Sequence, residues 1–424
     1  MKLFDYQKNI MFAEGVPIPK LAEEVGTPFY CYSTSALKMF FRNFSESLSG
    51  LNFGIYFSVK SNSNIAILKT LAEEGAGADV VSEGEMRRAL SAGIPGGKIV
   101  FSGVGKTPEE IKFALLNNVF QINVESYEEL QTIEKVAATV NIIANISIRI
   151  NPDIDAKTHK KISTGSKENK FGISWDKALS LFDVIHNYKH VKVNGLAVHI
   201  GSQLIDLKPF KKTFEFIAER VKELSNKGIY IKTLDLGGGL GAKYSNEEEP
   251  SVGDYARIVK NSFGKFDYHL MFEPGRSISA NSGILVTKII YIKKTSNKIF
   301  LIVDAAMNDF IRPTLYEASH EILPVINKYQ PLFEKQVDVV GPVCETGDYL
   351  AKDILFPEVA QNDLIVIKSA GAYGSVMSSN YNSRLLISEV LVKNSKHAII
   401  RKRQSYEELL RNEEFASWQK NISK

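Results

Sequence analysis

The sequence predicts an α/β protein built on a (β/α)8 barrel, together with a second, mostly antiparallel β domain. Eight short β-rich segments recur between residues 52 and 275, and segments with apolar residues at three- and four-residue spacing separate them. Eight parallel strands that alternate with helices close a barrel of the TIM type. After about residue 277, strand-like runs follow one another with few helices between them, which predicts the second domain.

Each expected barrel strand is short and apolar, and a segment with helical spacing follows it. The strands are expected at 52–59, 78–82, 98–102, 119–124, 142–150, 192–200, 231–236 and 268–273. The helices are expected at 64–75, 84–93, 108–117, 126–139, 175–187, 208–227 and 251–264. Thr107-Pro108-Glu-Glu110 marks a helix start, because it offers a capping hydroxyl, a first-turn proline and acids near the positive end of the dipole.

The second domain is expected to form around five strands, at 284–293, 298–303, 336–343, 363–369 and 385–392. The first 30 residues have no place in the barrel pattern and could return to this domain. We therefore expect a barrel domain over residues 31–276 and a β domain over residues 1–30 and 277–424. The tail after about residue 395 is expected to be a surface helix.

The composition is that of an ordinary globular protein, with 44% hydrophobic residues, a net charge of +4 and two cysteines in 424 residues. The basic clusters Lys157-Thr-His-Lys-Lys161 and Arg401-Lys-Arg403 lack stacking aromatics, so we interpret them as solvated surface and expect no nucleic-acid partner. Two cysteines suit a reducing compartment. Neither a signal-peptide pattern nor an apolar run of about 18 residues is seen, so we expect a cytoplasmic protein without a membrane partner. We expect no metal.

A barrel of this kind carries its catalytic groups at the carboxyl ends of its strands. Chemically capable residues fall there: Lys60 after the first strand, His199 after the sixth, the glycines at 237–239 after the seventh and Glu273 after the eighth. Lys60 follows an apolar run, so its amine should emerge at the rim. Partial desolvation there can lower the pKa of the amine and make it a nucleophile for a Schiff base. The alternative is a lysine that ends a strand and points into water.

The glycine run Asp235-Leu-Gly-Gly-Gly-Leu-Gly241 has three interpretations. Glycines after a strand leave backbone N–H groups open to a phosphate, and phosphate sites after strands seven and eight are frequent on this barrel. A dinucleotide site would require a long helix next, where this chain has a polar loop. A tight turn without a ligand is the third. The phosphate cradle is favoured.

Glu273 could pair with a cationic ring nitrogen, and Arg276 could bind a phosphate or carboxylate through two hydrogen bonds. An ion pair between Glu273 and Arg276 that merely shapes the turn is the alternative. His199 lies in an apolar strand and is either a hydrogen-bonded core residue or a ring that stacks on a flat cofactor. In the second case, Ser202 would supply a hydroxyl to a phosphate.

A loop-like stretch, Gly341-Pro-Val-Cys-Glu-Thr-Gly-Asp348, contains a thiol between acids. Cys344 is either inert packing or an acid beside a carboxylate, Glu345, that pairs with an amine. Cys31 has no such neighbours and is expected to be structural.

Two further motifs offer groups that suit an amino-acid carboxylate. Arg312 and Tyr316, in Arg312-Pro-Thr-Leu-Tyr316, provide a guanidinium and a phenol. Tyr373, in Gly371-Ala-Tyr-Gly374, provides another phenol on a flexible turn. Either motif could instead be a surface loop.

Taken together and in this order, these stretches resemble the fold-type III pyridoxal-phosphate-dependent decarboxylases, most closely those that act on diaminopimelate. The resemblance runs from about residue 27 to 392. Each motif is weak alone, but seven in order are specific. They are Tyr56-Phe-Ser-Val-Lys-Ser-Asn62, His199-Ile-Gly-Ser202, Gly237-Gly-Gly239, Glu273-Pro-Gly-Arg276, Arg312-Pro-Thr-Leu-Tyr316, Cys344-Glu-Thr-Gly-Asp348 and Gly371-Ala-Tyr373. Asn151-Pro-Asp-Ile-Asp155, Ser163-Thr-Gly165 and Lys170-Phe-Gly-Ile173 also fit. Ser61 stands where many relatives have alanine, with little expected consequence.

The resemblance implies how this chain would hold pyridoxal phosphate. Lys60 would carry it as a Schiff base, and His199 would stack on its ring. Glu273 would keep the ring nitrogen protonated, which makes the cofactor an electron sink. The phosphate, or the substrate beside it, would be surrounded by Ser202, Gly237, Gly238, Gly239, Gly275, Arg276 and Tyr373.

The resemblance also implies the substrate contacts. Arg312 and Tyr316 would hold the distal carboxylate of the substrate, and Glu345 its distal ammonium group. Cys344 would protonate the α-carbon after CO2 leaves. Cys344 and Glu345 would come from the neighbouring subunit, which implies a homodimer with shared active sites.

The implied reaction is the decarboxylation of meso-2,6-diaminopimelate to L-lysine, the last step of lysine synthesis. An ornithine or arginine decarboxylase of the same fold is the nearest alternative, but those substrates lack the distal carboxylate that Arg312 would bind. An alanine racemase would be expected to place an arginine, rather than Glu273, on the ring nitrogen. A non-catalytic binding homologue is the remaining alternative, and intact Lys60, Glu273 and Cys344 argue against it.

Overall fold

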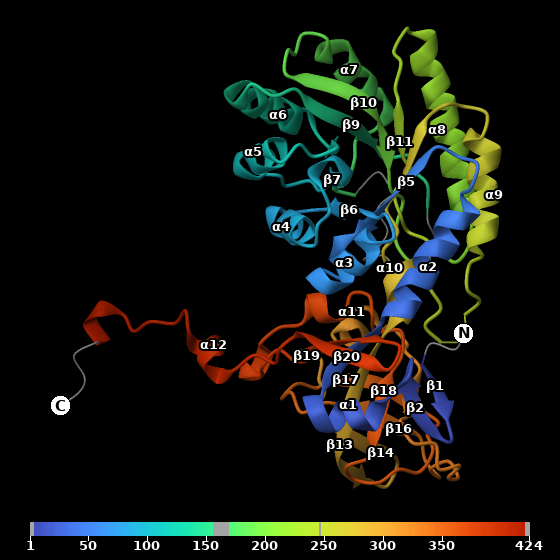
Figure 1. Cartoon of the computed structure of the whole chain (residues 1–424), viewed down its shortest axis with the longest axis vertical. Coiled ribbons are helices and arrows are strands. Elements are labelled where there is room, and N and C mark those ends of the chain that lie inside the picture. Colours follow the sequence, from blue (N-terminus) through green and yellow to red (C-terminus); the bar gives the residue numbers. More distant parts are fainter. Residues whose placement is uncertain (1–3, 156–168, 246, 420–424) are drawn as a thin grey trace. The chain divides into compact units, whose positions relative to one another are not determined.

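The computed structural model describes residues 4–155, 169–245 and 247–419 (Figure 1). It divides into two compact units. Unit 1 contains Ser33–Ile284 and Lys368–Val376, and unit 2 contains Lys2–Tyr32, Leu285–Ile367 and Met377–Lys424. The basic cluster expected at 157–161 and the motif Ser163-Thr-Gly165 lie outside the described residues.

Unit 1 is a closed barrel of parallel strands, which confirms the predicted fold class. Going round the barrel, the strand order is β10-β11-β12-β5-β6-β7-β8-β9. All eight expected strands are present: β5 (Phe53–Ser58), β6 (Gly77–Val80), β7 (Ile99–Phe101), β8 (Gln121–Val124), β9 (Ala144–Ile150), β10 (Val191–Val198), β11 (Thr233–Asp235) and β12 (His269–Phe272).

Helices surround the barrel in the places that the spacing predicts (Figure 1). They are α3 (Ile65–Ala72), α4 (Glu83–Ser91), α5 (Pro108–Leu116), α6 (Tyr127–Val140), α7 (Trp175–Ile185), α8 (Lys208–Asn226) and α9 (Val252–Phe263). α5 begins with the capping box that Thr107 and Glu110 predict. Two α-helices in the described part of this unit were not expected, namely α2 (Thr34–Ser47) before the first barrel strand and the short α10 (Arg276–Ser279) after the last.

The inside of the barrel is partly polar. Asn123 on β8 donates a hydrogen bond to Asp235 on β11 at 2.9 Å, and both side chains are buried. β8 and β11 are not neighbours in the barrel, so this bond crosses its interior. Buried polar side chains that bond across the lumen fix one another's orientation, because each would be costly without its partner.

Unit 2 is built on a nine-stranded sheet, most of whose pairs are antiparallel, as predicted. Its β14–β16 pair is parallel. The strands are β4 (Phe29–Ser33), β13 (Gly283–Lys294), β14 (Ile299–Val303), β15 (Ile322–Pro324), β16 (Val337–Val340), β17 (Tyr349–Ile354), β18 (Leu364–Ile367), β19 (Ser388–Lys393) and β20 (Lys396–Arg401). A three-stranded sheet joins β1 (Phe4–Gln7), β2 (Ile10–Ala13) and β3 (Val16–Pro17), and α1 (Ile18–Val25) follows.

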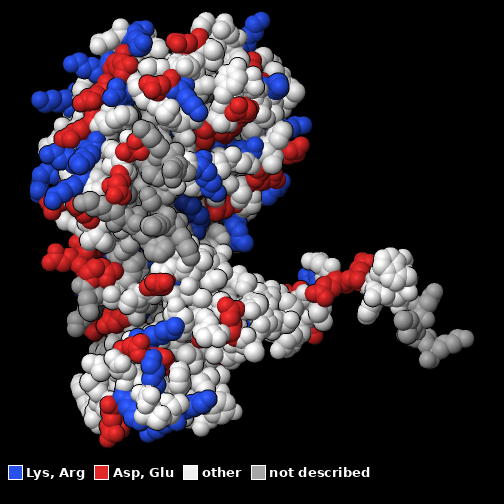
Figure 2. Space-filling model, turned by 180° about the vertical axis from the view of Figure 1, so that it is seen from behind, with Lys and Arg blue, Asp and Glu red and all other residues white. Residues whose placement is uncertain are grey.

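The prediction of a helical tail after residue 395 was wrong for its first part. β20 occupies residues 396–401 and pairs antiparallel with β19, with Lys396 opposite Lys393 and Arg401 opposite Glu389, so this part of the chain turns back as a hairpin. Further along the described tail, an α-helix forms at α12 (Tyr406–Leu410), in an arm that projects from the rest of unit 2 (Figure 1), and a 3-10 turn follows at Ser417–Gln419. Phe415 and Trp418 on this arm are exposed, and acidic side chains gather along it (Figure 2).

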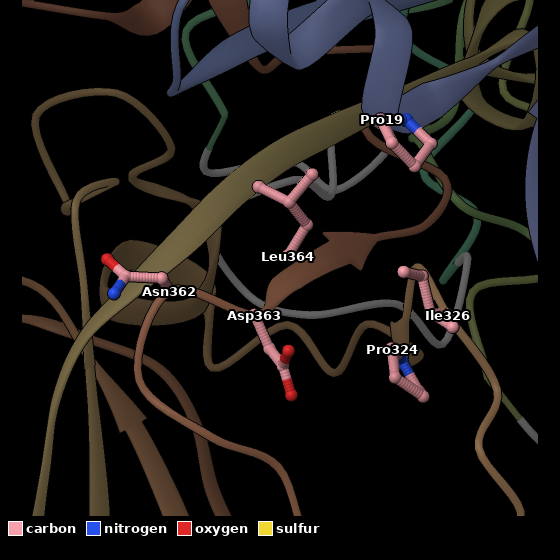
Figure 3. A pocket seen from close by; sticks show the side chains of 6 residues that line it. All are labelled: Pro19, Pro324, Ile326, Asn362, Asp363 and Leu364. Atoms are coloured by element: carbon pink, nitrogen blue, oxygen red, sulfur yellow. The ribbon is translucent and has the colours of Figure 1, made fainter.

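A small pocket of about 150 Å³ opens on unit 2, and no predicted site residue lines it (Figure 3). It is lined by Pro19, Pro324, Ile326, Asn362, Asp363 and Leu364. The Asp363 carboxylate already binds Lys328 Nζ at 3.0 and 3.1 Å, so we assign the pocket no ligand. Among the described helices, none is long and apolar enough to cross a bilayer.

Candidate active site

The carboxyl rim of the barrel carries the candidate residues of unit 1. Lys60 lies in a single 3-10 turn (Val59–Ser61) directly after β5, and Asp79 lies inside β6. His199 follows β10, and the glycines at 237–239 follow β11. Glu273 follows β12. Parallel strands end at one edge, so the closure of the barrel brings these five positions to one rim.

Lys60 is ion-paired with an aspartate. Lys60 Nζ lies 2.7 Å from Asp79 Oδ2, and the Ser58 hydroxyl donates to the same oxygen at 2.7 Å. The Asp79 side chain is fully buried, whereas that of Lys60 is 36% exposed. The second carboxylate oxygen, Asp79 Oδ1, has no hydrogen-bond partner among the described residues. The lysine side chain is therefore partly accessible at the rim, and the carboxylate that pairs with it is buried.

This ion pair corrects the expectation for the lysine pKa. Burial lowers the pKa of Lys60, but the surrounding groups, Asp79 first among them, raise it more, so the pKa lies above its ordinary value. Without a bound cofactor, Lys60 is therefore an ammonium group. The expectation considered desolvation alone, because the sequence does not show that a carboxylate 19 residues further on would lie beside the amine.

His199 is a neutral imidazole at the rim. Burial, followed by the positive charges of Arg149 and Lys60, lowers the pKa of His199 to about 3. Gly238 N donates to His199 Nδ1 at 3.2 Å, which assigns the ring proton to Nε2. The ring is partly exposed, so it is a rim residue rather than a core one. Ser202 lies in the loop that follows and is also partly exposed.

The glycine run passes so close to its neighbours that a side chain would not fit. A Cβ at Gly237 would lie 2.4 Å from Val198 O, and one at Gly238 would lie 2.1 Å from Glu273 O. Gly239 has φ +101°, which favours glycine. The N–H groups of Gly237 and Gly238 donate to Asp235 and His199. Two of the three amides that a phosphate cradle would use are thus engaged within the rim.

Glu273 and Arg276 face different partners, so the alternative of an ion pair between them does not hold. Arg276 Nη1 donates to the Tyr244 hydroxyl at 3.0 Å and to Gln203 Oε1 at 3.3 Å. Glu273 is buried and hydrogen-bonded to Asp235. Burial, then the charges of Asp235 and Asp79, raise the pKa of Glu273 well above its ordinary range.

Tyr373 belongs to the short segment that returns to unit 1 late in the sequence. Its backbone N–H donates to Ser61 O at 2.8 Å, and Asn62 Nδ2 donates to Gly371 O at 3.0 Å. The Arg276 guanidinium lies 4.9 Å from the centre of the Tyr373 ring. The Gly371-Ala-Tyr motif is thus attached to the loop that carries Lys60.

Unit 2 brings together the two other motifs. Arg312 and Tyr316 lie on α11 (Arg312–Tyr316), where the guanidinium is 5.8 Å from the Tyr316 ring centre. Arg312 is buried, and its Nε donates to His320 Nε2 at 3.3 Å. Thr314, on the same helix, donates to Gly347 O at 2.7 Å, which ties α11 to the loop of Cys344.

The loop between β16 and β17 exposes both Cys344 and Glu345. Its shape depends on the buried Asp348, whose carboxylate accepts backbone N–H groups from Met307 and Val343, each at 2.7 Å. Cys344 N donates to Asn382 Oδ1 at 2.9 Å. By contrast, Cys31 is fully buried, and burial raises its thiol pKa, so that thiol is inert.

Sequence reasoning missed Asp79, Asn123 and the role of Asp235. A signal was available for the first and last, because a charged residue inside an apolar strand is rarely buried without a partner. The sequence around Asn123 gave no indication of its role, because its partner lies across the barrel. No cluster of three or more metal-binding side chains occurs within the described residues.

The closed parallel barrel, with an ion-paired lysine and a glycine run on its carboxyl rim, defines the class. Residues 35–280 match the family described as "Pyridoxal-dependent decarboxylase, pyridoxal binding domain". Over 420 residues, the chain is 47% identical to the diaminopimelate decarboxylase of Zymomonas mobilis, which covers 98% of this chain and 99% of that one. The chain belongs to the diaminopimelate decarboxylase family of pyridoxal-phosphate-dependent enzymes.

Solved structures agree. Helicobacter pylori diaminopimelate decarboxylase, crystallised with L-lysine, is 46% identical and superposes with a TM-score of 0.89 over 93% of this chain and 98% of that one. The M. jannaschii enzyme in complex with L-lysine is 35% identical, with a TM-score of 0.93 over 98% of both chains. In both cases the likeness spans unit 1 and unit 2.

Proposed function

We propose that this protein decarboxylates meso-2,6-diaminopimelate to L-lysine and CO2, as the last step of lysine synthesis. The observation that carries the proposal is the Lys60 amine, ion-paired with Asp79 at the mouth of a closed barrel. The full-length likeness to diaminopimelate decarboxylases, two of them crystallised with L-lysine, supports the choice of substrate.

The rim fits pyridoxal phosphate. Lys60 would hold its aldehyde carbon, neutral His199 its ring face and Glu273 its ring nitrogen. The buried oxygen Asp79 Oδ1 and the buried hydroxyl of Ser277 lack partners among the described residues, which is a state that bound groups relieve. When bound, the cofactor would withdraw electrons from the α-carbon of the substrate, so that CO2 can leave.

The phosphate would lie against the backbone of the glycine loop and of Gly275, where side chains do not fit. A Cβ at Gly275 would lie 3.0 Å from Ser61 Cβ. Ser202, Arg276 and Tyr373 would add donors around it. Two glycine amides are already engaged, so Arg276 would supply most of the positive charge.

Asp79 would control the protonation state of Lys60. It stabilises the ammonium form of the lysine, so Lys60 must lose a proton before it can bond to a carbonyl carbon. His199 stays neutral at pH 7 and adds no positive charge beside the amine. Asp79 would therefore hold the lysine side chain in place while it is detached from the cofactor.

Unit 2 would select the substrate. Arg312 and Tyr316 would bind the distal carboxylate, Glu345 the distal ammonium group, and Cys344 would protonate the α-carbon. Cys344 and Glu345 are exposed within one chain, which supports their presentation to a second subunit. We accordingly propose a homodimer with shared active sites.

The decisive test measures lysine released from meso-diaminopimelate by the purified protein, with ornithine as the competing substrate. We expect lysine formation, and a cofactor attached to Lys60 that borohydride fixes in place. Lys60→Ala should abolish both activity and covalent attachment. If the Lys60→Ala variant still fixed cofactor, the cofactor site would be wrong, and turnover of ornithine alone would refute the substrate.

A further inference from the structure

The polar side chains inside the barrel form a chain of hydrogen bonds in which each residue donates to the next. Thr233 Oγ1 donates to Gln121 Oε1 at 3.0 Å, and Gln121 Nε2 donates to Asn123 Oδ1 at 2.8 Å. Thr233, Gln121 and Asn123 are all buried. With the oxygen of Asn123 accepting from Gln121, the network turns its amide nitrogen toward the opposite side of the barrel.

That amide nitrogen has two acceptors. It donates to Asp235 Oδ2 at 2.9 Å and to Ser102 Oγ at 3.0 Å. Ser102 in turn donates its own hydrogen to Glu273 Oε1, at a longer 3.5 Å. Asp235 also receives the Gly237 N–H at 3.0 Å on its other oxygen. The stronger donors therefore point at Asp235, and Glu273 receives one long hydroxyl contact.

Two buried carboxyls in contact cannot both be ionised at low cost. Donors stabilise the ionised form, so the charge belongs on Asp235 and the proton on Glu273. The surrounding charges agree. Burial and then Asp235 and Asp79 raise the pKa of Glu273, an effect that Lys60 only partly offsets. Burial and the charge of Asp79 also raise the pKa of Asp235 above its ordinary value, but hydrogen bonds from Asn123, Glu273 and Gly237 partly oppose this rise.

We propose that Asn123 is a positioning residue of the active site. Its amide, oriented by Gln121 and Thr233, keeps the negative charge on Asp235 and so leaves the proton on Glu273, the member of the pair at the rim. This role rests on the proposed function, in which Glu273 would face the ring nitrogen of the cofactor as a neutral acid. Glu273 would supply the proton of that nitrogen: its O–H bond would be replaced by an N–H bond, and Glu273 would remain as a carboxylate.

The location of the proton can be measured in the full-length protein without cofactor. Infrared spectra of wild type minus Glu273→Gln isolate a protonated carboxyl band, and 13C-carboxyl labelling of either all aspartates or all glutamates assigns it. At pH 7 we expect a band that shifts with labelled glutamate. A band that shifts with labelled aspartate, or no band at all, would overturn the proposal. This wild-type result does not depend on the folding of an Asn123 variant.

Asn123→Leu removes both donors at similar volume. We expect the protonated band to shift with labelled aspartate, and the dissociation constant of pyridoxal phosphate to rise about tenfold, the usual loss for a hydrogen bond to a charged group. Ser147→Ala is the matched control, because Ser147 is equally buried and pairs with Asn123 along the backbone, while the hydrogen bond of its side chain is the 3.5 Å contact with Thr233. A specific role for Asn123 would be refuted if the protonated band still shifted with labelled glutamate in Asn123→Leu. It would also be refuted if the band moved to aspartate in Ser147→Ala.

The two proposals fail separately. The infrared assignment uses protein without cofactor, so a chain that turned over another amino acid would leave it standing. Conversely, the protein could release lysine from diaminopimelate while the proton shared by Asp235 and Glu273 lies on Asp235. That result would refute the role of Asn123 and leave the proposed function standing.

Discussion

The candidate residues of unit 1 and unit 2 are held in different ways. On the barrel rim, Asp79 and Glu273 are buried at or inside strand ends, and each charge or proton is set by its neighbours. In unit 2, Cys344 and Glu345 are exposed in a loop whose shape comes from hydrogen bonds to its backbone. The proposed function would thus depend on charge balance in unit 1 and on backbone geometry in unit 2.

The largest expected effect tests the charge balance of the rim. Asp79→Ala should lower kcat/KM by about 10- to 100-fold, because a charged hydrogen bond to Lys60 is lost. The Lys60 pKa should fall, because burial then acts with less opposition. Ser58→Ala, which removes a neutral donor to the same oxygen, is the control and should cost less. The pH dependence of amine labelling at Lys60 measures the shift, and an unchanged profile in Asp79→Ala would contradict the ion pair.

A smaller effect is expected when the loop of unit 2 is loosened. Asp348→Ala leaves the buried N–H groups of Met307 and Val343 without their acceptor, so the Cys344 loop should shift. We expect kcat to fall about tenfold through the displaced thiol, with cofactor affinity unchanged. Asp353→Ala, on the exposed part of β17, is the matched control. Loss of cofactor binding in Asp348→Ala would show that the two units are not independent in this respect.

The smallest effect concerns the stability of the rim. Burial raises the pKa of Glu85 to about 7, although the Val81 N–H and Lys60 partly oppose it. The folded state therefore keeps a proton that the unfolded chain releases, so this carboxyl should make the protein less stable as pH rises from about 4.5 to 7. Allowing for partial exposure, we expect the free energy of unfolding to fall by about 1 kcal/mol between pH 5 and 7.

Urea titrations at both pH values measure this change in stability. In Glu85→Gln this change in stability between pH 5 and 7 should disappear. In Glu128→Gln, on the outer helix α6, it should be the same as in wild type. An equal pH dependence in wild type and Glu85→Gln would exclude Glu85 as its source.

The fold was largely predictable from sequence, because its signals are local. Eight apolar runs separated by helical spacing specify the barrel, and even the start of α5 follows from Thr107 and Pro108. In the large sheet of unit 2, β4, β15, β17 and β20 were missed. β17 and β20 are edge strands with exposed residues and weak alternation. The tail was interpreted as a helix for the same reason.

The site was predictable only where position along a strand decides it. Lys60 and Glu273 could be placed on the rim because each follows a strand. Their protonation states could not, since these depend on Asp79 and Asp235, which approach only when the barrel closes. Asn123 is the extreme case, because its partner is 112 residues away across the lumen.

The return of residues 368–376 to unit 1 has a consequence for synthesis on the ribosome. Asn62 binds Gly371, 309 residues later, and Ser61 binds the backbone of Tyr373. All eight barrel strands leave the ribosome before these partners exist, although domains commonly fold as they emerge. The loop that carries Lys60 is thus completed only late in translation, so a nascent chain cut short after the barrel would lack a finished lysine site.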